Sequence, residues 1–314
     1  MLKVLLVKTS SLGDVVHNLP VVTDIRMRFS DACIDWAVEE DYVPLVRLHP
    51  AIRRVIPVAI RRWRARLLGA STWSEIGALR RLFRAERYDA IIDTQGLIKS
   101  AILARAARGR HHGFDANSAR EPLAARLYDV EHHVPRNQHA VLRNRALVAS
   151  ALGYRADAPA GCGITAPRAS SAPYAVLLHS TSRADKLWPE EHWVALAREM
   201  EGRGLRCVLP WGSDEERSRS SRIAACLSDA LVPGRLPIAD LTALLSGAAS
   251  VVGVDTGLTH LAAALGVPVV ALYSGSDPAL TGVYGARRAR NLGGPGRVAE
   301  VAEVSAALCE LGAV

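Results

Sequence analysis

The fold class follows from one run of the sequence, which reads Ser250-Val251-Val252-Gly253-Val254-Asp255-Thr256-Gly257-Leu258-Thr259-His260-Leu261-Ala262-Ala263-Ala264-Leu265. Its β-branched part, its Asp-Thr-Gly bend and its Ala- and Leu-rich part predict a buried strand, a tight turn and a helix that begins at Gly257. The free N–H groups and the positive dipole end of such a helix suit a phosphate, with Asp255 and His260 at the rim. An ordinary strand-to-helix crossover with Asp255 or Thr256 as the N-cap would give the same pattern, so that alternative stays open.

Strand and helix signals alternate through both halves of the 314-residue chain, which is long enough for two domains. The expected strands are 3–7, 34–38, 55–58, 90–93, 174–179, 206–210, 250–254 and 269–272, and the expected helices are 72–85, 97–107, 139–152, 189–202, 214–227, 238–246 and 298–311. This alternation predicts parallel sheets, and an Ala-, Gly-, Pro- and Ser-rich segment, 153–173, is the expected linker. We therefore expect an α/β protein of two Rossmann-like domains, 1–165 and 166–314, with sheets that face a central cleft. That is the GT-B architecture of glycosyltransferases, although a two-lobed epimerase or binding protein would have the same coarse pattern.

The cysteines and the apolar segments bear on the cellular compartment. The five cysteines are scattered and form no C-x-x-C pair, which argues against a disulfide framework or a zinc site and favours a reducing cytosol. The apolar start, Met1 to Val7, is too short for a signal peptide, and Lys8 interrupts it. The longest apolar region, 241–273, is broken by three polar or glycine-containing turns, so it predicts buried strands and a helix instead of a membrane span.

The net charge of +8 is unevenly distributed along the chain. Residues 1–167 hold 25 Lys and Arg against 16 Asp and Glu, a net charge of +9, whereas residues 168–314 hold 14 against 15, a net charge of −1. Eleven arginines and only two acids, Glu75 and Glu86, lie between Arg47 and Arg87. Such a surface could meet nucleic acid, an anionic membrane or a polyanionic substrate, or it could be an ordinary solvated face.

A cation is expected beside the helix start at Gly257. Transfer of a sugar from a nucleotide needs a metal or fixed positive groups to stabilise the departing diphosphate. Because the sequence has no D-x-D motif, we expect no metal at the diphosphate. No cofactor is expected. Lys186, one of four lysines, follows the strand 174–179 and is the expected cation, unless it is a solvated loop residue. Three histidines in a polar loop have a crude metal-like spacing and are expected to make surface or anion contacts: His132, His133 and His139.

A base for the acceptor hydroxyl is expected in the amino-terminal half. Asp14 follows the first strand in a loop of small residues, at the carboxyl end where open α/β sheets bind ligands, although it could simply be a helix N-cap. Asp93 also ends a strand, but the Gln95-Gly96 turn after it is better suited to acceptor or domain contact. The loop before Asp14 contains neither G-x-G-x-x-G nor G-x-x-x-x-G-K-[ST], which argues against a dinucleotide-binding epimerase and against a P-loop.

Six stretches of the sequence carry a resemblance to a known family. They are Lys8-Thr9-Ser10-Ser11-Leu12-Gly13-Asp14-Val15-Val16-His17, Val55-Ile56-Pro57-Val58-Ala59-Ile60-Arg61-Arg62-Trp63-Arg64, Asp93-Thr94-Gln95-Gly96-Leu97-Ile98-Lys99-Ser100, Ala119-Arg120-Glu121-Pro122-Leu123, Asp185-Lys186-Leu187-Trp188-Pro189-Glu190-Glu191-His192-Trp193 and Val254-Asp255-Thr256-Gly257-Leu258-Thr259-His260-Leu261. Together they resemble the lipopolysaccharide heptosyltransferases of glycosyltransferase family 9, and most closely the type that adds the first heptose. The Asp-Thr-Gly-x-x-His pattern is typical of the wider family, and the second and fifth stretches are typical of that first type.

The resemblance implies an inverting, metal-independent GT-B enzyme of lipopolysaccharide inner-core biosynthesis. Such an enzyme transfers L-glycero-D-manno-heptose from ADP-heptose to a Kdo residue of Kdo2-lipid A. It would be cytoplasmic, peripheral on the cytoplasmic face of the inner membrane, and would have no nucleic-acid partner. The basic amino-terminal half fits an acceptor that carries phosphates and carboxylates beside an anionic membrane. A heptosyltransferase II-like enzyme that adds the second heptose, and a non-catalytic ADP-sugar-binding module, are the alternatives.

The resemblance also implies roles for individual residues. Asp14 would be the catalytic base. The donor would be held by Thr181, Ser182, Lys186, Asp255, Thr256, Gly257 and His260, with Glu216 and the backbone near Leu236 at the adenosine. The acceptor would be held by Arg61, Arg62, Arg64 and Arg120. At Ser182 and Leu236 the chain carries conservative departures from the residues that are usual in the family.

Overall fold

The structure, a computed structural model, describes residues 1–66, 68–159, 161–167 and 173–313. The chain divides into two compact units, the amino-terminal unit Met1–Gly163 and the carboxy-terminal unit Ile164–Val314. The domain boundary expected from the sequence lies two residues further along. The expected linker, 153–173, includes residues 160 and 168–172, which lie outside the described residues.

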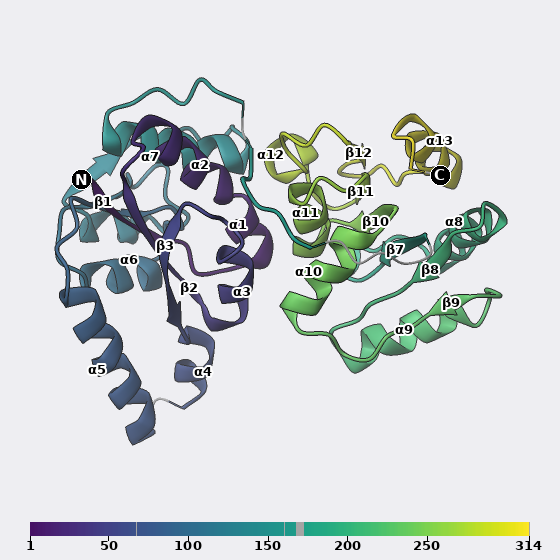
Figure 1. Ribbon diagram of the computed structural model, residues 1–314, viewed down its shortest axis with the longest axis horizontal. Coiled ribbons are helices and arrows are strands. Elements are labelled where there is room, and N and C mark those ends of the chain that lie inside the picture. The colour runs from purple at the N-terminus through teal and green to yellow at the C-terminus, as the bar shows by residue number, and fades with distance from the viewer. Residues whose placement is uncertain (67, 160, 168–172, 314) are drawn as a thin grey trace. The chain divides into compact units, whose positions relative to one another are not determined.

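The amino-terminal unit is built around a parallel six-stranded sheet in the order β3-β2-β1-β4-β5-β6 (Figure 1). Its elements are β1 (Lys3–Val7), α1 (Leu12–Val16), α2 (Leu19–Arg28), β2 (Cys33–Glu39), the 3-10 turn η1 (Glu40–Tyr42), α3 (Val43–Val46), β3 (Ile52–Val58), α4 (Ile60–Ala65), α5 (Ala70–Arg84), β4 (Ala90–Asp93), α6 (Ile98–Arg105), β5 (His111–Phe114), the 3-10 helix η2 (Pro122–Leu127), β6 (Val130–His132) and α7 (Ala140–Leu152).

Helices cover both faces of this sheet, which is why its central strands are almost continuously apolar. Leu79 and Phe83 of α5 and Ala104 of α6 pack against one face of the strands, in a cluster that includes Leu5 and Ile91. Helices α2 and α7 pack against each other and lie on the other side of the sheet (Figure 1). The sheet is therefore buried between two helical layers, and its ligand-accessible groups are confined to the strand ends.

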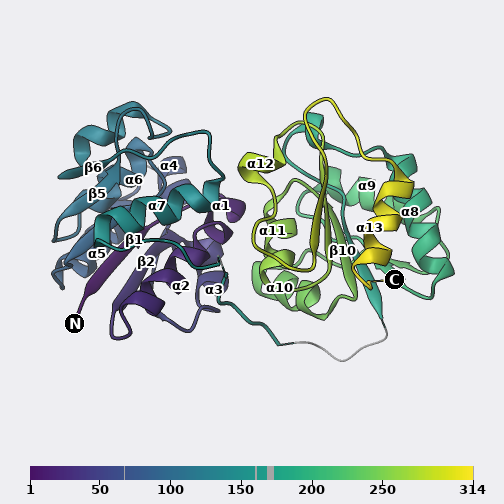
Figure 2. The same cartoon turned by 90° about the horizontal axis from the view of Figure 1, so that it is seen from above.

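The carboxy-terminal unit repeats this plan with the strand order β12-β11-β10-β7-β8-β9, again all parallel. Its elements are β7 (Tyr174–Leu178), the 3-10 turn η3 (Ala184–Lys186), α8 (Glu190–Gly202), β8 (Arg206–Val208), α9 (Asp214–Ala224), β9 (Ala230–Leu231), α10 (Ile238–Gly247), β10 (Ser250–Val254), α11 (Gly257–Ala264), β11 (Val269–Tyr273), α12 (Pro278–Thr281), β12 (Ala289–Gly293) and α13 (Val301–Glu310). Helices α8, α9 and α13 supply the core on one face of the sheet, and α10 and α11 cover the other, as Figure 2 shows around β10.

Counted from its own first strand, each sheet has the order 3-2-1-4-5-6, so the predicted class, α/β with two Rossmann-like parallel sheets, is confirmed. The order reverses between β1 and β4 in one unit and between β7 and β10 in the other. At such a reversal the two loops diverge and leave a crevice at the carboxyl ends of the strands, where open α/β sheets bind ligands. Asp14 and Asp255 follow β1 and β10, and they therefore belong to these two crevices.

The sequence did not predict four of the strands, β5, β6, β9 and β12. Each of them is short or lies toward the edge of its sheet. The residues of β12, Ala-Arg-Asn-Leu-Gly, are mostly exposed or half-buried. An edge strand such as β12 is less completely covered by the helices than a central strand, so it lacks the apolar run by which β1 and β10 are recognised. Strand β5 is buried, but its residues, His-His-Gly-Phe, form no apolar run.

Candidate functional site

In the carboxy-terminal unit, the helix start at Gly257 is tied closely to the end of β10. Thr256 is the N-cap of α11 and has an extended backbone. The Thr259 hydroxyl donates a 2.7 Å hydrogen bond to the Val254 carbonyl. A Cβ atom on Gly253 would lie only 2.2 Å from that hydroxyl, so glycine is required in the strand for this approach. The N–H groups of the first helical turn are consequently held in a fixed position relative to the strand end.

Asp255 is the centre of a network of hydrogen bonds at this helix start. Its Oδ2 atom accepts hydrogen bonds of 2.6 Å from both Lys186 Nζ and Ser276 Oγ, and Nε2 of His260 lies 3.4 Å from Oδ1. Burial alone would raise the pKa of Asp255, but the hydrogen bonds from His260, Lys186 and Ser276 outweigh it and hold the pKa well below its usual range. The Thr181 hydroxyl donates to the Asp255 carbonyl at 3.4 Å. The carboxylate is thus ionised at neutral pH, and it fixes the Lys186 ammonium beside the start of α11.

Lys186 is not a solvated loop cation, because only 17% of its side chain is exposed. The loop that carries it is held by Trp188, which is buried and donates from Nε1 to the Ala299 carbonyl at 2.8 Å. Ser276, which lies in the loop after β11, was not among the predicted site residues. The Ser274-Gly275-Ser276 stretch could have indicated it, since small and polar residues after a buried strand mark a ligand-side loop in this fold.

The other residues predicted for the donor lie on neighbouring loops of the same unit. Glu216 is in the first turn of α9, after β8, and its Oε2 atom accepts a 2.7 Å hydrogen bond from the Gly212 N–H. Leu236 is half-buried in the loop between β9 and α10. Trp211 Nε1 donates to the Pro233 carbonyl at 2.7 Å and so joins these two loops. Ser182 is exposed in the loop after β7.

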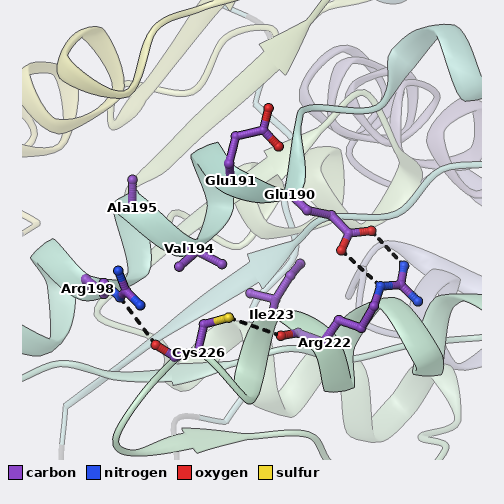
Figure 3. A pocket seen from close by; sticks show the side chains of 8 residues that line it. All are labelled: Glu190, Glu191, Val194, Ala195, Arg198, Arg222, Ile223 and Cys226. Atoms are coloured by element: carbon purple, nitrogen blue, oxygen red, sulfur yellow. Dashed lines mark hydrogen bonds and ion pairs between the residues drawn. The ribbon is translucent and has the colours of Figure 1, made fainter.

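A groove lies between α8 and α9 (Figure 3). It has a volume of about 460 Å³ and is lined by Glu190, Glu191, Val194, Ala195, Arg198, Arg222, Ile223 and Cys226. Arg222 and Glu190 form a bidentate ion pair in it, with distances of 3.0 Å from Nε to Oε2 and 2.6 Å from Nη2 to Oε1. None of the predicted site residues lines this groove, and its opposite charges already neutralise each other.

In the amino-terminal unit, Asp14 is not a helix N-cap, because Ser11 takes that position and Asp14 is the third residue of α1. Its carboxylate accepts from the Ser11 N–H at 3.1 Å and from the Ser11 hydroxyl at 3.3 Å. Arg120 donates to it from both guanidinium ends, at 2.7 Å to Oδ1 and 3.2 Å to Oδ2. Burial would raise the pKa of Asp14, but the charges of Lys8 and Arg120 and the Ser11 N–H bring it below the usual value. Asp14 is therefore an ionised carboxylate at neutral pH.

Near this carboxylate lies Lys8, a buried lysine that was not among the predicted site residues. Its Nζ atom donates to the Thr94 carbonyl at 2.8 Å. Burial lowers the pKa of Lys8 to about 8, an effect that the nearby Arg120 and Arg143 charges reinforce and Asp14 opposes. A lysine at the end of a strand is ordinarily a solvated residue, so only the packing of the loops above it reveals this position.

Gln95, which the sequence suggested for acceptor or domain contact, connects two loops of its own unit. It is buried, and its Oε1 atom accepts from the Thr9 N–H at 2.7 Å, the Thr9 hydroxyl at 2.9 Å and the Ser10 N–H at 3.4 Å. Its Nε2 atom donates to the Ser10 carbonyl at 2.5 Å. The β4 loop is thereby joined to the β1 loop, three residues before α1. Asp93 is also structural, because its buried carboxylate accepts from Ser100 and Tyr128.

The arginines predicted to hold the acceptor differ in how far they are already engaged. Arg62 lies between two carboxylates, with hydrogen bonds of 3.0 Å to Glu40 and 2.9 Å to Glu75. Arg61 is exposed and donates to the Tyr42 hydroxyl at 3.3 Å, and Arg64 is exposed in the last turn of α4. Arg61 and Arg64 are thus better placed than Arg62 to meet an external anion.

The three histidines do not converge. His132 bonds to His112 and Ser150, and His133 pairs with Asp115. The expectation of a surface or anion contact is wrong for His139, which is buried and caps α7 by accepting from the Val141 N–H. Among the residues that the structure describes, no group of three or more His, Cys, Asp or Glu is arranged to hold a metal ion. Within the same residues, no helix has both the length and the apolar character needed to cross a bilayer.

Two parallel Rossmann-like sheets of identical order, with a cation and a helix start at one reversal point and a carboxylate at the other, define the class of GT-B glycosyltransferases. Comparisons with known proteins lead to the family. Residues 76–307 match glycosyltransferase family 9 (heptosyltransferase). The chain belongs to glycosyltransferase family 9, the heptosyltransferases, as the resemblance in the sequence implied.

Relatives and solved structures agree with this assignment over nearly the whole chain. Lipopolysaccharide heptosyltransferase 1 of Salmonella typhimurium is 46% identical over 90% of this chain and 92% of its own length. The structure of the E. coli heptosyltransferase WaaC with ADP has 41% identity and a TM-score of 0.92, and covers 99% of this chain and 100% of its own. The structure of the same enzyme with ADP-2-deoxy-2-fluoro heptose has 40% identity and a TM-score of 0.86, and it covers 98% of this chain and 99% of its own. The predicted enzyme class, a heptosyltransferase of lipopolysaccharide biosynthesis, is confirmed.

Proposed function

We propose that this chain transfers L-glycero-D-manno-heptose from ADP-heptose to a Kdo residue of Kdo2-lipid A, with inversion at the anomeric carbon. The observation that carries the proposal is the pair of strand-end sites. One presents a cation and helical N–H groups, which suit a diphosphate, and the other presents an ionised carboxylate, which suits a base. The ADP and ADP-sugar analogue bound by the related E. coli enzyme support a donor of this kind.

The carboxy-terminal unit would bind the donor. The N–H groups at Thr256 and Gly257 and the Lys186 ammonium would stabilise the negative charge that develops on the diphosphate as it leaves. Asp255 and His260 would orient Lys186, and Thr181 and Ser182 would contact the diphosphate and sugar from the loop after β7. The loops that carry Glu216 and Leu236 would hold the adenosine, at the carboxyl ends of the adjacent strands β8 and β9.

The amino-terminal unit would bind the acceptor and supply the base. Asp14 would take the proton of the acceptor hydroxyl while the hydroxyl oxygen forms a bond to the anomeric carbon. The bond from that carbon to the β-phosphate oxygen would break at the same time, and its electron pair would leave with ADP. Arg61, Arg62, Arg64 and Arg120 would meet the acceptor's carboxylates and phosphates.

The same unit would lie against the anionic cytoplasmic face of the inner membrane. The segment 60–84 contains seven arginines and one acid, Glu75, and helices α4 and α5 extend from one end of this unit (Figure 1). Leu68 is fully exposed and Trp73 is largely exposed beside these arginines. Arginines attract anionic headgroups, and Trp and Leu residues enter the interface between headgroups and acyl chains.

The test of this function is ADP release by the wild type and by Asp14→Asn, each with ADP-heptose and Kdo2-lipid A. Asparagine keeps the size of the side chain but cannot accept the proton, so kcat should fall by at least about a hundredfold while ADP-heptose affinity stays close to wild type. A kcat within about tenfold of wild type would remove Asp14 from the mechanism.

The choice of acceptor is tested separately, with Kdo2-lipid A against the same lipid already carrying one heptose. The 46% identity to a heptosyltransferase 1 over nearly the whole chain favours the unheptosylated acceptor over the second-heptose reaction. A preference for the heptosylated lipid would instead assign the second transfer. Donor binding without any turnover would indicate an ADP-sugar-binding module.

A further inference from the structure

We propose that Arg120 is a latch on the catalytic carboxylate. It covers Asp14 in the absence of acceptor, and an anionic group of the acceptor draws it away, so that the base becomes available only when the acceptor is bound. This inference rests on the proposed function, in which Asp14 is the base. It adds that acceptor binding and base activation are one event, and that the latch suppresses the transfer of heptose to water.

The pairing geometry supports a latch. Arg120 forms a bidentate pair with Asp14, in which each terminal guanidinium nitrogen donates to one carboxylate oxygen. This is the strongest arrangement of an arginine–carboxylate pair. The Asp14 side chain is 14% exposed and the Arg120 side chain 50% exposed, so Arg120 lies on the solvent side and the carboxylate lies behind it. A hydroxyl that is to give its proton to Asp14 must reach an oxygen that Arg120 already contacts.

Only the side chain of Arg120 has to move, because the backbone on both sides of it is anchored. The Glu121 N–H donates to the Gly96 carbonyl at 3.0 Å, and the Glu121 carboxylate accepts from the Ile98 N–H at 2.7 Å. On the other side, Arg136 donates to the Ala119 carbonyl. A Cβ atom on Gly96 would lie 3.3 Å from the Arg120 nitrogen, which shows how closely this segment packs on the turn after β4.

The surrounding charge explains why an anion would release the latch. Burial lowers the pKa of both Lys8 and Arg143, and the Arg120 charge adds to this effect at each of them, as the Arg136 charge does at Arg143. Arg120 therefore belongs to a cluster of positive charges. Asp14 is the carboxylate that Arg120 neutralises in this group. An incoming carboxylate or phosphate is attracted to the cluster and competes with Asp14 for the Arg120 guanidinium. Lys8 remains beneath Asp14 and keeps it ionised after Arg120 has left.

The experiment measures ADP-heptose hydrolysis in the absence of acceptor, because water then replaces the acceptor hydroxyl. Water would give one proton to Asp14, its oxygen would bond to the anomeric carbon, and the sugar–phosphate bond would break to release ADP. In Arg120→Met the base is uncovered, so hydrolysis should rise by about tenfold or more over wild type. The double variant Arg120→Met with Asp14→Asn should return to the wild-type level or below, which ties the increase to the base.

Arg126→Met is the matched control, since Arg126 is an exposed arginine six residues further along and is not part of the proposed site. It should hydrolyse ADP-heptose at the wild-type rate.

The pH profile of ADP-heptose hydrolysis gives a second readout. The groups that face Asp14 are Lys8, Ser11, His17 and Arg120. Loss of Arg120 raises the pKa of Asp14, so the acidic limb of the hydrolysis profile should move to higher pH.

The source of the releasing anion is resolved by adding acceptor analogues that lack the accepting hydroxyl. One analogue keeps the sugar carboxylate and the other keeps only the lipid phosphates. The analogue that draws Arg120 away should stimulate hydrolysis by the wild type but not by Arg120→Met. The latch is overturned if Arg120→Met hydrolyses the donor no faster than Arg126→Met. A separate result tests the base: near-normal heptose transfer by Asp14→Asn would show that Asp14 is not the base. The hydrolysis assay thus tests the latch, and the transfer assay tests the proposed function.

Discussion

At the residue scale, we expect Lys186 to contribute the largest single charge to donor binding. Its ammonium is fixed 2.6 Å from Asp255 and only 17% of the side chain is exposed. Lys186→Met removes a charge-assisted contact to phosphate of about 1.5–3 kcal/mol, so ADP-heptose should bind about 10- to 150-fold more weakly, with lower turnover. Calorimetric titration measures the affinity, and Lys99→Met, which changes an exposed lysine of α6, is the control. Unchanged donor binding and rate would show that Lys186 has only a structural role.

The buried Lys8 side chain should make the free energy of unfolding depend on pH. Its pKa falls from 10.5 to about 8 on folding, chiefly because of burial. Between these two values the unfolded chain binds more protons than the folded one, so the free energy of unfolding should rise with pH across this window. Across the whole window, the Lys8 pKa shift should raise the free energy of unfolding by an amount on the order of 3 kcal/mol.

Lys8→Met should remove this pH-dependent increment and should not destabilise the protein at pH 7. Urea unfolding at intervals from pH 7 to 10.5 measures the effect as a difference from wild type. Lys3→Met, which changes a half-exposed lysine at the start of β1, the strand before Lys8, controls for other groups that titrate in this range. Parallel profiles for wild type and Lys8→Met would contradict the assignment of a buried, pKa-shifted lysine.

At the scale of elements, the Gln95 carboxamide joins the loops after β1 and β4, and the β1 loop leads directly into α1 and Asp14. We expect Gln95 to be a positioning residue. In Gln95→Ala, kcat should fall by at least about tenfold, because a misplaced base transfers protons poorly. The donor KM should stay near wild type, because the predicted donor residues lie in the other unit. A purely structural role would lower the melting temperature and leave kcat unchanged.

Two further variants separate the effect on position from the effect on stability. Gln95→Glu keeps the acceptor for Thr9 but replaces the donor to the Ser10 carbonyl by an oxygen. It should therefore lose activity, although less than the alanine variant. Thr94→Val changes the adjacent buried side chain, whose hydroxyl makes only a 3.5 Å contact to Val7, and should leave kcat near wild type. A kcat for Thr94→Val as low as that of Gln95→Ala would contradict a specific role for Gln95.

At the scale of the whole molecule, the charge asymmetry predicts which surface meets the membrane. A basic residue near an anionic bilayer contributes about 1 kcal/mol, so Arg61→Met and Arg64→Met should each weaken binding to phosphatidylglycerol-containing vesicles about fivefold at low salt. The differences should shrink at high salt, because screening shortens the range of the attraction. Co-sedimentation at two ionic strengths measures both effects.

Arg62→Met is the internal comparison for this prediction. The Arg62 guanidinium is already engaged by Glu40 and Glu75, so its loss should affect vesicle binding less than the loss of Arg61 or Arg64. Equal losses for all three arginines, at every ionic strength, would indicate that the segment supports the fold and does not form a membrane-binding surface.

Local patterns in the sequence determined the fold class, the family and most of the elements. The run from Ser250 to Leu265 is recognisable because a buried strand, a turn and a helix start each depend on residues within about ten positions. The strand end and the helix from Gly257 followed from it, whereas the choice of Thr256 over Asp255 as the N-cap came from the structure. The short outer strands, such as β12, did not follow, because an edge strand buries too little side chain to leave an apolar signature.

Only the tertiary structure decided which of the candidate side chains meet. Arg120 is 106 residues from Asp14, and Gln95 is 86 residues from Thr9. Gln95 meets Thr9 because β4 pairs with β1 at the point where the strand order reverses. Arg120 reaches Asp14 because β5 pairs with β4 and the segment after β5 packs on the turn after β4. The burial of Lys8 has the same cause. Sequence motifs could name the carboxylate and the arginine, but long-range packing placed one against the other.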